Sequence, residues 1–232
     1  MNEELSFKYS EARSLPIILL LDTSGSMSIN GHINVLNNCV REMLADFSEQ
    51  NDNNVSIDVA IYAFGPDGRQ ILPLTPAKQA VEIYQDMSAN GMTPLGAALS
   101  LAKSELIERK DVLPSRAYRP TVVLVSDGEP NDNWQAALNA FVNEGRSAKC
   151  YRMAMGIGVN KGTQAYKVLE DFVSDKEQVF SADQSKQIKS FFKYVTVSTI
   201  SRTRSANPNA IQSSVNTLIK SNQDDDDDDE VF

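Results

Sequence analysis

Asp22, Ser24 and Ser26 stand at alternate positions directly after an apolar run over residues 16–21. Such a run is typical of a parallel strand that is buried on both faces. One carboxylate and two hydroxyl groups in a single turn are oxygen donors of the kind that bind Mg²⁺ or Mn²⁺, and Gly25 is expected to let this turn close tightly. Short Ser and Asp clusters also form polar turns and helix caps, so the segment alone leaves both interpretations open.

Two more oxygen-bearing side chains are predicted to lie near this turn. Thr93 is expected to cap the N-terminus of a helix, with Pro94 at the first helical position. Asp127 follows a second buried-strand pattern over residues 121–125. Ligands of doubly wound sheets bind beyond the carboxyl ends of the strands. We therefore predict one divalent-cation site, favouring Mg²⁺ with Mn²⁺ or Ca²⁺ as alternatives, that is formed by Asp22, Ser24, Ser26, Thr93 and Asp127.

The elements that must position these residues alternate between strand and helix patterns. Strands are expected near residues 16–21, 55–62, 69–74, 121–125, 150–157 and 178–180, and helices near residues 31–50, 77–87, 93–106, 134–144 and 163–172 and from residue 184 onward. The turn signal at residues 65–68 predicts a hairpin between the second and third strands. The predicted fold class is α/β: a doubly wound, mostly parallel, Rossmann-like sheet with one antiparallel edge hairpin and helices on both faces.

An acidic run over residues 224–230 dominates the charge of the chain. It carries seven negative charges, and without them the net charge of −9 falls to −2. We predict a domain over residues 1–204 and a flexible acidic C-terminal tail over residues 205–232. The only basic cluster noted in the domain, Arg202 and Arg204, is too small for the phosphate-facing surface of a nucleic-acid-binding protein.

Export and membrane insertion are not expected. Residues 1–13 lack the apolar core of a secretory signal, and the longest apolar run, residues 15–21, is far shorter than the ~20 residues that a membrane-spanning helix needs. Cys39 and Cys150 are interpreted as small buried hydrophobic residues and not as a disulfide. A cytoplasmic location is expected.

The pattern Asp22-x-Ser24-x-Ser26, the later Thr93 and the turn that contains Asp127 resemble the metal-ion-dependent adhesion site (MIDAS) of von Willebrand factor A (VWA) domains. Within that family the chain looks most like bacterial TerY-like proteins of tellurium-resistance and stress-response gene clusters. The resemblance implies that Ser24 and Ser26 bind the ion directly, Thr93 directly or through water, and Asp22 and Asp127 often through water. It also implies a non-enzymatic protein whose ion grips an acidic residue of a partner, with a protein kinase or PP2C-type phosphatase as candidate partners.

Two further hypotheses remain open. The first is a Mg²⁺-dependent phosphohydrolase with Asp22 as nucleophile, which is disfavoured because Ser24 stands where such enzymes place a second aspartate as general acid. The second is that an aspartate of residues 224–229 occupies the open metal position in cis, or in a neighbouring molecule. Met27 and Met92 flank the predicted ligands and form either an adaptable rim for a partner or ordinary core contacts.

Overall fold

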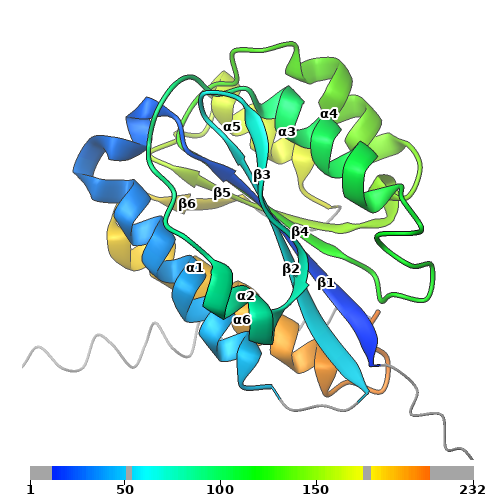
Figure 1. The fold of residues 1–232 in the computed structure, drawn as a ribbon. Coiled ribbons are helices and arrows are strands. Elements are labelled where there is room, and N and C mark those ends of the chain that lie inside the picture. Colours follow the sequence, from blue (N-terminus) through cyan, green and yellow to red (C-terminus); the bar gives the residue numbers. More distant parts are fainter. Residues whose placement is uncertain (1–11, 51–53, 175–178, 210–232) are drawn as a thin grey trace, which may run out of the picture.

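The structure is a computed structural model that describes residues 12–50, 54–174 and 179–209. A six-stranded sheet runs through the middle of it in the order β3-β2-β1-β4-β5-β6 (Figure 1). All neighbouring strands are parallel except β2 and β3, which form an antiparallel hairpin at one edge. The strands are β1 (Arg13–Asp22), β2 (Val55–Phe64), β3 (Gly68–Pro76), β4 (Thr121–Ser126), β5 (Tyr151–Ile157) and β6 (Phe180–Ala182). The predicted fold class is confirmed.

The order of the strands places the ends of β1 and β4 side by side. The chain builds outward from β1 through β2 and β3, then crosses to the other side of β1 and continues through β4, β5 and β6. Leu21 pairs with Val125 in the parallel register of β1 and β4, so the next residue of each strand, Asp22 and Ser126, ends it at the same edge. The strand order therefore switches sides between β1 and β4. In doubly wound sheets, ligands bind beyond the strand ends at this point.

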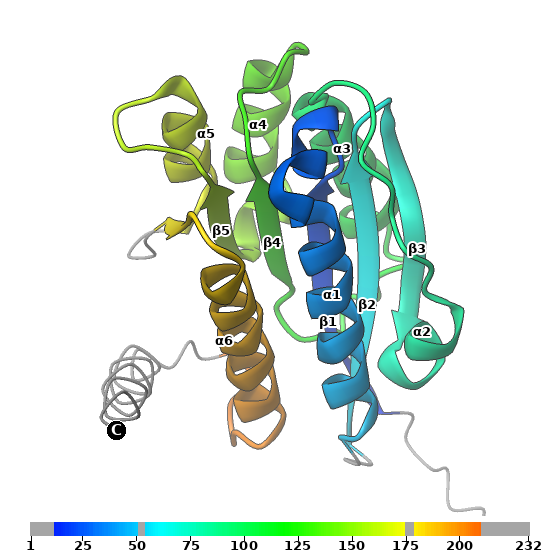
Figure 2. The ribbon, with the colours of Figure 1, turned by 90° about the vertical axis from the view of Figure 1, so that its left-hand side faces the viewer.

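Helices cover both faces of the sheet (Figures 1 and 2). Alternate residues of β1 point to opposite faces, because successive side chains of a strand alternate. Ile17, Leu19 and Leu21 belong to the core shared with α1, α2 and α6, whereas Ile18 and Leu20 belong to the core shared with α3, α4 and α5. The helices are α1 (His32–Ser48), α2 (Ala77–Ile83), α3 (Leu95–Ala102), α4 (Trp134–Asn143), α5 (Gln164–Phe172) and α6 (Ser185–Thr203), with short helical turns η1 (Gly25–Gly31), η2 (Lys103–Ile107) and η3 (Ser147–Lys149).

Two predicted helix boundaries are wrong: α2 ends at Ile83 and not near residue 87, and α3 begins one residue later than expected. The helix α3 begins at Leu95, with Pro94 as its N-cap residue, so Thr93 lies one position before the cap. Proline at either position has a backbone angle that suits a helix start, and the local sequence did not separate the two. The first amide of α3, Leu95 N, donates to the main-chain oxygen of Thr93 at 2.9 Å. The next two donate to the Asp132 carboxylate, Gly96 N at 3.1 Å and Ala97 N at 2.9 Å.

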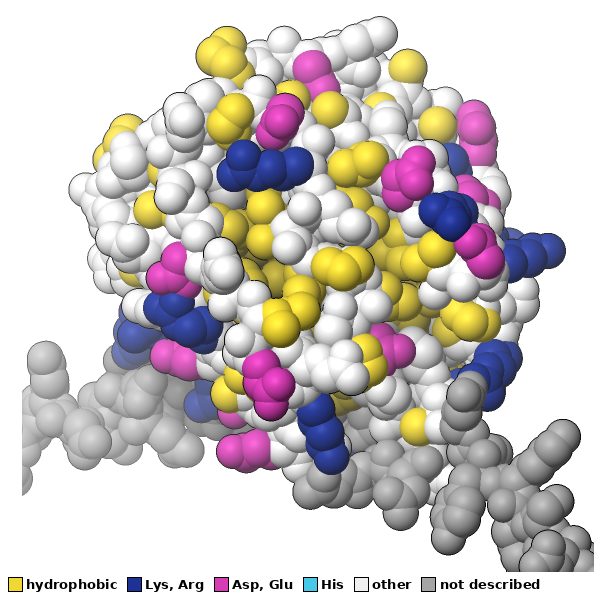
Figure 3. All heavy atoms as spheres, in the orientation of Figure 1, with side chains coloured by type: hydrophobic (Ala, Val, Ile, Leu, Met, Phe, Trp, Pro, Cys, Tyr) yellow, Lys and Arg dark blue, Asp and Glu magenta, His cyan; other side chains and the backbone are white. Residues whose placement is uncertain are grey.

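The surface and the cysteines agree with an ordinary globular domain. On the face that Figure 3 shows, Lys and Arg side chains are interspersed with Asp and Glu side chains around a central group of hydrophobic ones. Cys39 and Cys150 are both buried and carry free thiols. None of the helices in the described ranges is long and apolar enough to cross a membrane.

The chain continues to pack on the domain just after α6. Arg202, which is buried, donates to the main-chain oxygen of Pro208 at 2.7 Å, and Arg119 N donates to Asn209 Oδ1 at 2.7 Å. These contacts bring Asn209 to the edge of the sheet where the parallel strands begin. The acidic run over residues 224–230 lies outside the described residues, as do residues 1–11.

Substitution of Leu19 tests whether β1 lies in the core of the sheet. Its side chain is fully buried between β1 and the helices of one face, so Leu19→Ala should lower the free energy of unfolding by about 2–5 kcal/mol through lost burial and a residual cavity. Val81→Ala on α2, where the side chain is 38% exposed, should change it by less than about 0.5 kcal/mol. Urea unfolding followed by circular dichroism measures both, and equal losses would contradict the assignment.

Candidate metal site

The Asp22 carboxylate is the buried anchor of the edge where β1 and β4 end. It is 0% exposed. Its Oδ1 accepts from Ser24 N at 2.8 Å and its Oδ2 accepts from the Ser126 hydroxyl at 2.7 Å. Asp22 therefore holds its own turn closed and ties that turn to the end of β4. Ser126 was not among the predicted site residues, because the sequence places it only in the turn between the predicted strand and Asp127.

Three side-chain oxygens form a triangle just above this anchor. The hydroxyls of Ser24 and Ser26 lie 2.9 Å apart, and Asp127 Oδ1 lies 2.9 Å from Ser26 Oγ and 3.4 Å from Ser24 Oγ. Two of these residues come from the turn after β1 and one from the turn after β4. The structure therefore brings four of the five predicted residues, Asp22, Ser24, Ser26 and Asp127, into one hydrogen-bonded cluster.

Thr93 lies on a third loop that is tied to the same turn through main-chain contacts. Gly25 N donates to Gly91 O at 3.1 Å, and Asn90 N donates to Thr23 O at 2.7 Å. Thr93 is 8% exposed, and its main chain is held by Asn131, whose Oδ1 accepts from Thr93 N at 3.2 Å and whose N donates to Thr93 O at 3.1 Å. Asn131 was also missed by the sequence analysis.

The glycines that this packing requires differ from the one that was predicted. Gly25 does not have a positive φ, and a Cβ there would meet only Gly91 O at an ordinary 3.5 Å. Gly91, by contrast, has φ +78°, and a Cβ on Gly65 would lie 2.7 Å from Thr23 O and 2.8 Å from Asn90 O. The loops around the site approach one another at Gly65 and Gly91, where a side chain would separate them.

The negative charge of the two aspartates is poorly compensated, because burial raises the pKa of Asp127 by more than His32 lowers it. Burial raises the pKa of Asp22 to about 6, with a further increase from Asp127, although hydrogen bonds from Ser24 and Ser126 oppose the shift. Burial likewise raises the pKa of Asp127. No Lys or Arg in the described part of the chain forms an ion pair with either carboxylate. A cation at the triangle would offset both negative charges.

The donor set fits a small, hard dication. Two oxygens bound to Mg²⁺ at right angles lie about 2.9 Å apart, because its bonds are ~2.0–2.1 Å long. Two of the three edges of the triangle are 2.9 Å long and the third is 3.4 Å. The described residues contain no group of three or more His, Cys, Asp or Glu arranged to hold a metal, so a metal here would depend on serine hydroxyls, and Ser24, Ser26 and Asp127 are the residues that would hold it.

The methionines that flank the site have different environments. Met27, the buried residue of η1, packs fully buried in the core on the α1 side of the sheet, so the interpretation as a core contact holds for it. Met92, next to Thr93, is 65% exposed, and Ile29 in η1 is 60% exposed. The apolar groups available to a partner around the triangle are therefore Met92 and Ile29.

The fold and this edge define a doubly wound α/β domain that carries a cluster of oxygen donors where the strand order reverses. Residues 17–194 match the von Willebrand factor type A domain, and the chain belongs to that family. A comparison with curated protein sequences gives no match.

Solved structures share the fold at low sequence identity. Proximal thread matrix protein 1 from the mussel byssus, in a structure with a zinc-occupied MIDAS motif, is 18% identical with a TM-score of 0.59 over 81% of this chain and 46% of its own. A von Willebrand factor type A protein from Catenulispora acidiphila is 19% identical, with a TM-score of 0.57 over 81% and 43%. The pilus adhesin SpaC from Lactobacillus rhamnosus GG is 14% identical, with a TM-score of 0.66 over 84% and 31%. This chain spans less than half the length of each of these three.

Ser126 provides a test that the sequence motif does not suggest. Ser126→Ala removes the hydroxyl that holds Asp22 Oδ2, and loss of a group that orients a ligand typically lowers metal affinity about 10- to 100-fold. Calorimetric titration with Mn²⁺ measures the change. Glu129→Gln, which alters an exposed carboxylate two residues after Asp127, is the matched control and should leave the affinity unchanged. Equal Mn²⁺ affinity in wild type and Ser126→Ala would contradict this role.

Proposed function

We propose that this protein is a divalent-cation-dependent protein-interaction module. The observation that carries the proposal is the triangle of Ser24 Oγ, Ser26 Oγ and Asp127 Oδ1 above the buried Asp22 carboxylate. A divalent cation held there, most simply Mg²⁺, supplies an open coordination position to an anionic ligand. The zinc-occupied MIDAS motif of the mussel protein supports the same use of the fold, as does the adhesive role named for SpaC.

The partner group that fits this site is a carboxylate. The triangle supplies two neutral hydroxyls and one carboxylate, so the charge of a dication is only partly offset by the residues that face it. An Asp or Glu of the partner would bind at the open coordination position of the ion, and Met92 and Ile29 would give it an apolar rim. The TerY-like resemblance adds the finer proposal of a cytoplasmic stress-response or tellurium-resistance complex, with a kinase or PP2C-type phosphatase as partner.

Catalysis by Asp22 is a weaker candidate. A nucleophilic carboxylate must reach the substrate, but Asp22 is 0% exposed and hydrogen bonds hold both of its oxygens. We therefore propose that the protein acts without chemistry of its own. Phosphate release from generic substrates that disappears in Asp22→Asn would contradict this.

Metal removal tests the main proposal. Immobilised protein should retain a partner from native lysate in Mg²⁺, and excess EDTA should lower the retained amount at least about tenfold, because a lost metal–carboxylate contact removes more than about 1.4 kcal/mol of binding free energy. Asp127→Ala should lower the retained amount as much as EDTA does, and Glu129→Ala should retain as much partner as wild type. Quantitative mass spectrometry identifies the proteins that follow this pattern. Retention that is equal with and without EDTA would overturn the mechanism.

The apolar rim gives a separate prediction. Met92→Ser should weaken partner binding at least about fivefold, the change that about 1 kcal/mol produces, while Mn²⁺ affinity stays the same. Ile83→Ser is the control, since Ile83 is 54% exposed at the end of α2 and should have no effect. Biolayer interferometry with the captured partner measures both variants. A fall in Mn²⁺ affinity in Met92→Ser would show that the residue acts on the metal site instead.

A further inference from the structure

A strongly basic pocket lies at the edge of the sheet opposite the candidate metal site. It has a volume of about 560 Å³ and gathers five cationic side chains from three segments of the chain, Arg13, Lys110, Arg119, Arg146 and Lys149, with no acidic residue among its described lining. Arg13 is the first residue of β1, and Arg119 and Lys149 precede β4 and β5 by two residues. The pocket therefore sits where the parallel strands begin.

The positive charges of this pocket are held in place without being neutralised. None of the five forms an ion pair within the described ranges of the chain. The Arg13 guanidinium lies 3.9 Å from the centre of the Tyr118 ring. Arg119 donates to the main-chain oxygens of Lys149 at 2.7 Å and Cys150 at 3.3 Å, and carbonyl oxygens fix its position but carry no net charge.

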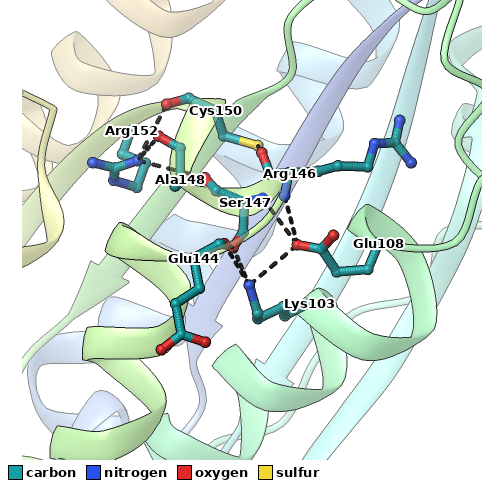
Figure 4. Close-up of polar contacts among 8 residues, drawn as sticks. All are labelled: Lys103, Glu108, Glu144, Arg146, Ser147, Ala148, Cys150 and Arg152. Atoms are coloured by element: carbon teal, nitrogen blue, oxygen red, sulfur yellow. Dashed lines mark hydrogen bonds and ion pairs between the residues drawn. The ribbon is translucent and has the colours of Figure 1, made fainter.

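Arg146, a lining residue of the pocket, carries a buried hydrogen-bond donor that no described residue satisfies. Its Nη1 is buried and has no hydrogen-bond partner, although an unpaired buried donor is costly and rare. Glu108 Oε1 accepts instead from the main-chain N of Arg146 at 2.8 Å and from Lys103 Nζ at 3.1 Å. Figure 4 shows the Arg146 side chain extending away from the Glu108 carboxylate. That acid therefore does not satisfy the guanidinium.

A neighbouring buried arginine shows the same excess of positive charge. Burial and then the charge of Arg119 lower the pKa of Arg202 to about 10. Arg202 donates to Thr121 Oγ1 at 2.7 Å and to the main-chain oxygen of Arg119 at 2.6 Å, so its partners are neutral as well. An anionic group in the pocket would relieve this repulsion.

The chain itself carries a matching anion. The last described residue, Asn209, lines the pocket, and fourteen residues separate it from the run of six aspartates and one glutamate at residues 224–230. For fifteen residue steps, the root-mean-square length of a random coil is about 20–23 Å. The metal site lies a full β1 away, about 33 Å at ~3.3 Å per residue. The acidic run thus reaches the basic pocket without the extension that the metal site requires.

We propose that the acidic segment of residues 224–230 docks in cis into the basic pocket formed by Arg13, Lys110, Arg119, Arg146 and Lys149. The tail then blocks this pocket against acidic peptides offered by other proteins. Docking in the basic pocket leaves the metal position free. This proposal therefore replaces the hypothesis that an aspartate of the tail binds the metal. The inference does not depend on the proposed function, since it concerns the opposite edge of the sheet.

A spin label at the end of the full-length chain locates the tail. Val231→Cys provides the attachment point, because Cys39 and Cys150 are only 2% and 1% exposed and react slowly when buried. The label should weaken the amide NMR signals of Lys110, Arg119 and Lys149 and leave those of Ser26 and Gly128 unchanged, with or without EDTA. Weakening of Ser26 and Gly128 that EDTA abolishes, or no localised weakening, would overturn the proposal.

Charge-reversed pairs provide matched controls for this measurement. Lys110→Glu with Lys149→Glu changes two exposed lysines of the pocket and should abolish the localised weakening. Lys189→Glu with Lys193→Glu makes the same charge change on exposed positions of α6 and should preserve it. If both pairs abolish the effect, net charge and not the pocket attracts the tail, and the proposal fails.

Competition with a free peptide gives the size of the effect. A fluorescent hexa-aspartate peptide should bind about tenfold or more tightly to a full-length variant in which residues 224–229 are all asparagine than to wild type, because a tethered segment competes at millimolar effective concentration. Raising the salt concentration should weaken the binding to the variant. Equal affinity for wild type and variant, measured by fluorescence anisotropy, would show that the tail leaves the pocket open.

Discussion

The buried carboxylate of Asp22 joins the ends of the two central strands, and the geometry of the functional edge depends on it. One oxygen closes the turn that carries Ser24 and Ser26, and the other receives the hydroxyl of Ser126 at the end of β4. A buried carboxylate must find hydrogen-bond donors or lose its charge. Meeting that requirement sets the distance between the two turns, and it places Asp127 within hydrogen-bonding distance of both serines.

The opposite ends of the sheet carry opposite unbalanced charge. At one edge, Asp22 and Asp127 lie close together without a Lys or Arg ion pair in the described structure. At the other edge, cations from several segments face a pocket without an acidic lining residue in the described ranges. Uncompensated charge in partly buried positions is unfavourable, so each edge is suited to a ligand of the other sign: a divalent cation at the first and an acidic peptide at the second.

The loops around the metal edge show how a binding surface is built on a rigid sheet. Main-chain contacts of Asn90 and Gly91 fix the loop before α3 against the turn after β1, and Gly65 in the turn after β2 accepts from Met92 N of the same loop. Asn131 and Asp132 fix the loop after β4 against the start of α3. The side chains that would touch a cation therefore rest on neighbours from three loops. Exposed apolar groups, Met92 and Ile29, remain at the rim, where a partner would cover them.

The sequence by itself determined the strands and helices, their alternation and the antiparallel hairpin, because burial on one or both faces leaves a period in the order of apolar residues. It also placed Asp22, Ser24 and Ser26 in one turn, since that depends on neighbours in the chain. Only the tertiary structure decided that Ser126 holds Asp22, that the Asp132 side chain and not that of Thr93 accepts from amides at the start of α3, and that Gly65 and Gly91, in place of Gly25, allow the loops to meet. It alone assembled the basic pocket, whose cationic side chains come from three segments. Each of these contacts joins residues that the sheet register brings together, and no local pattern records that register.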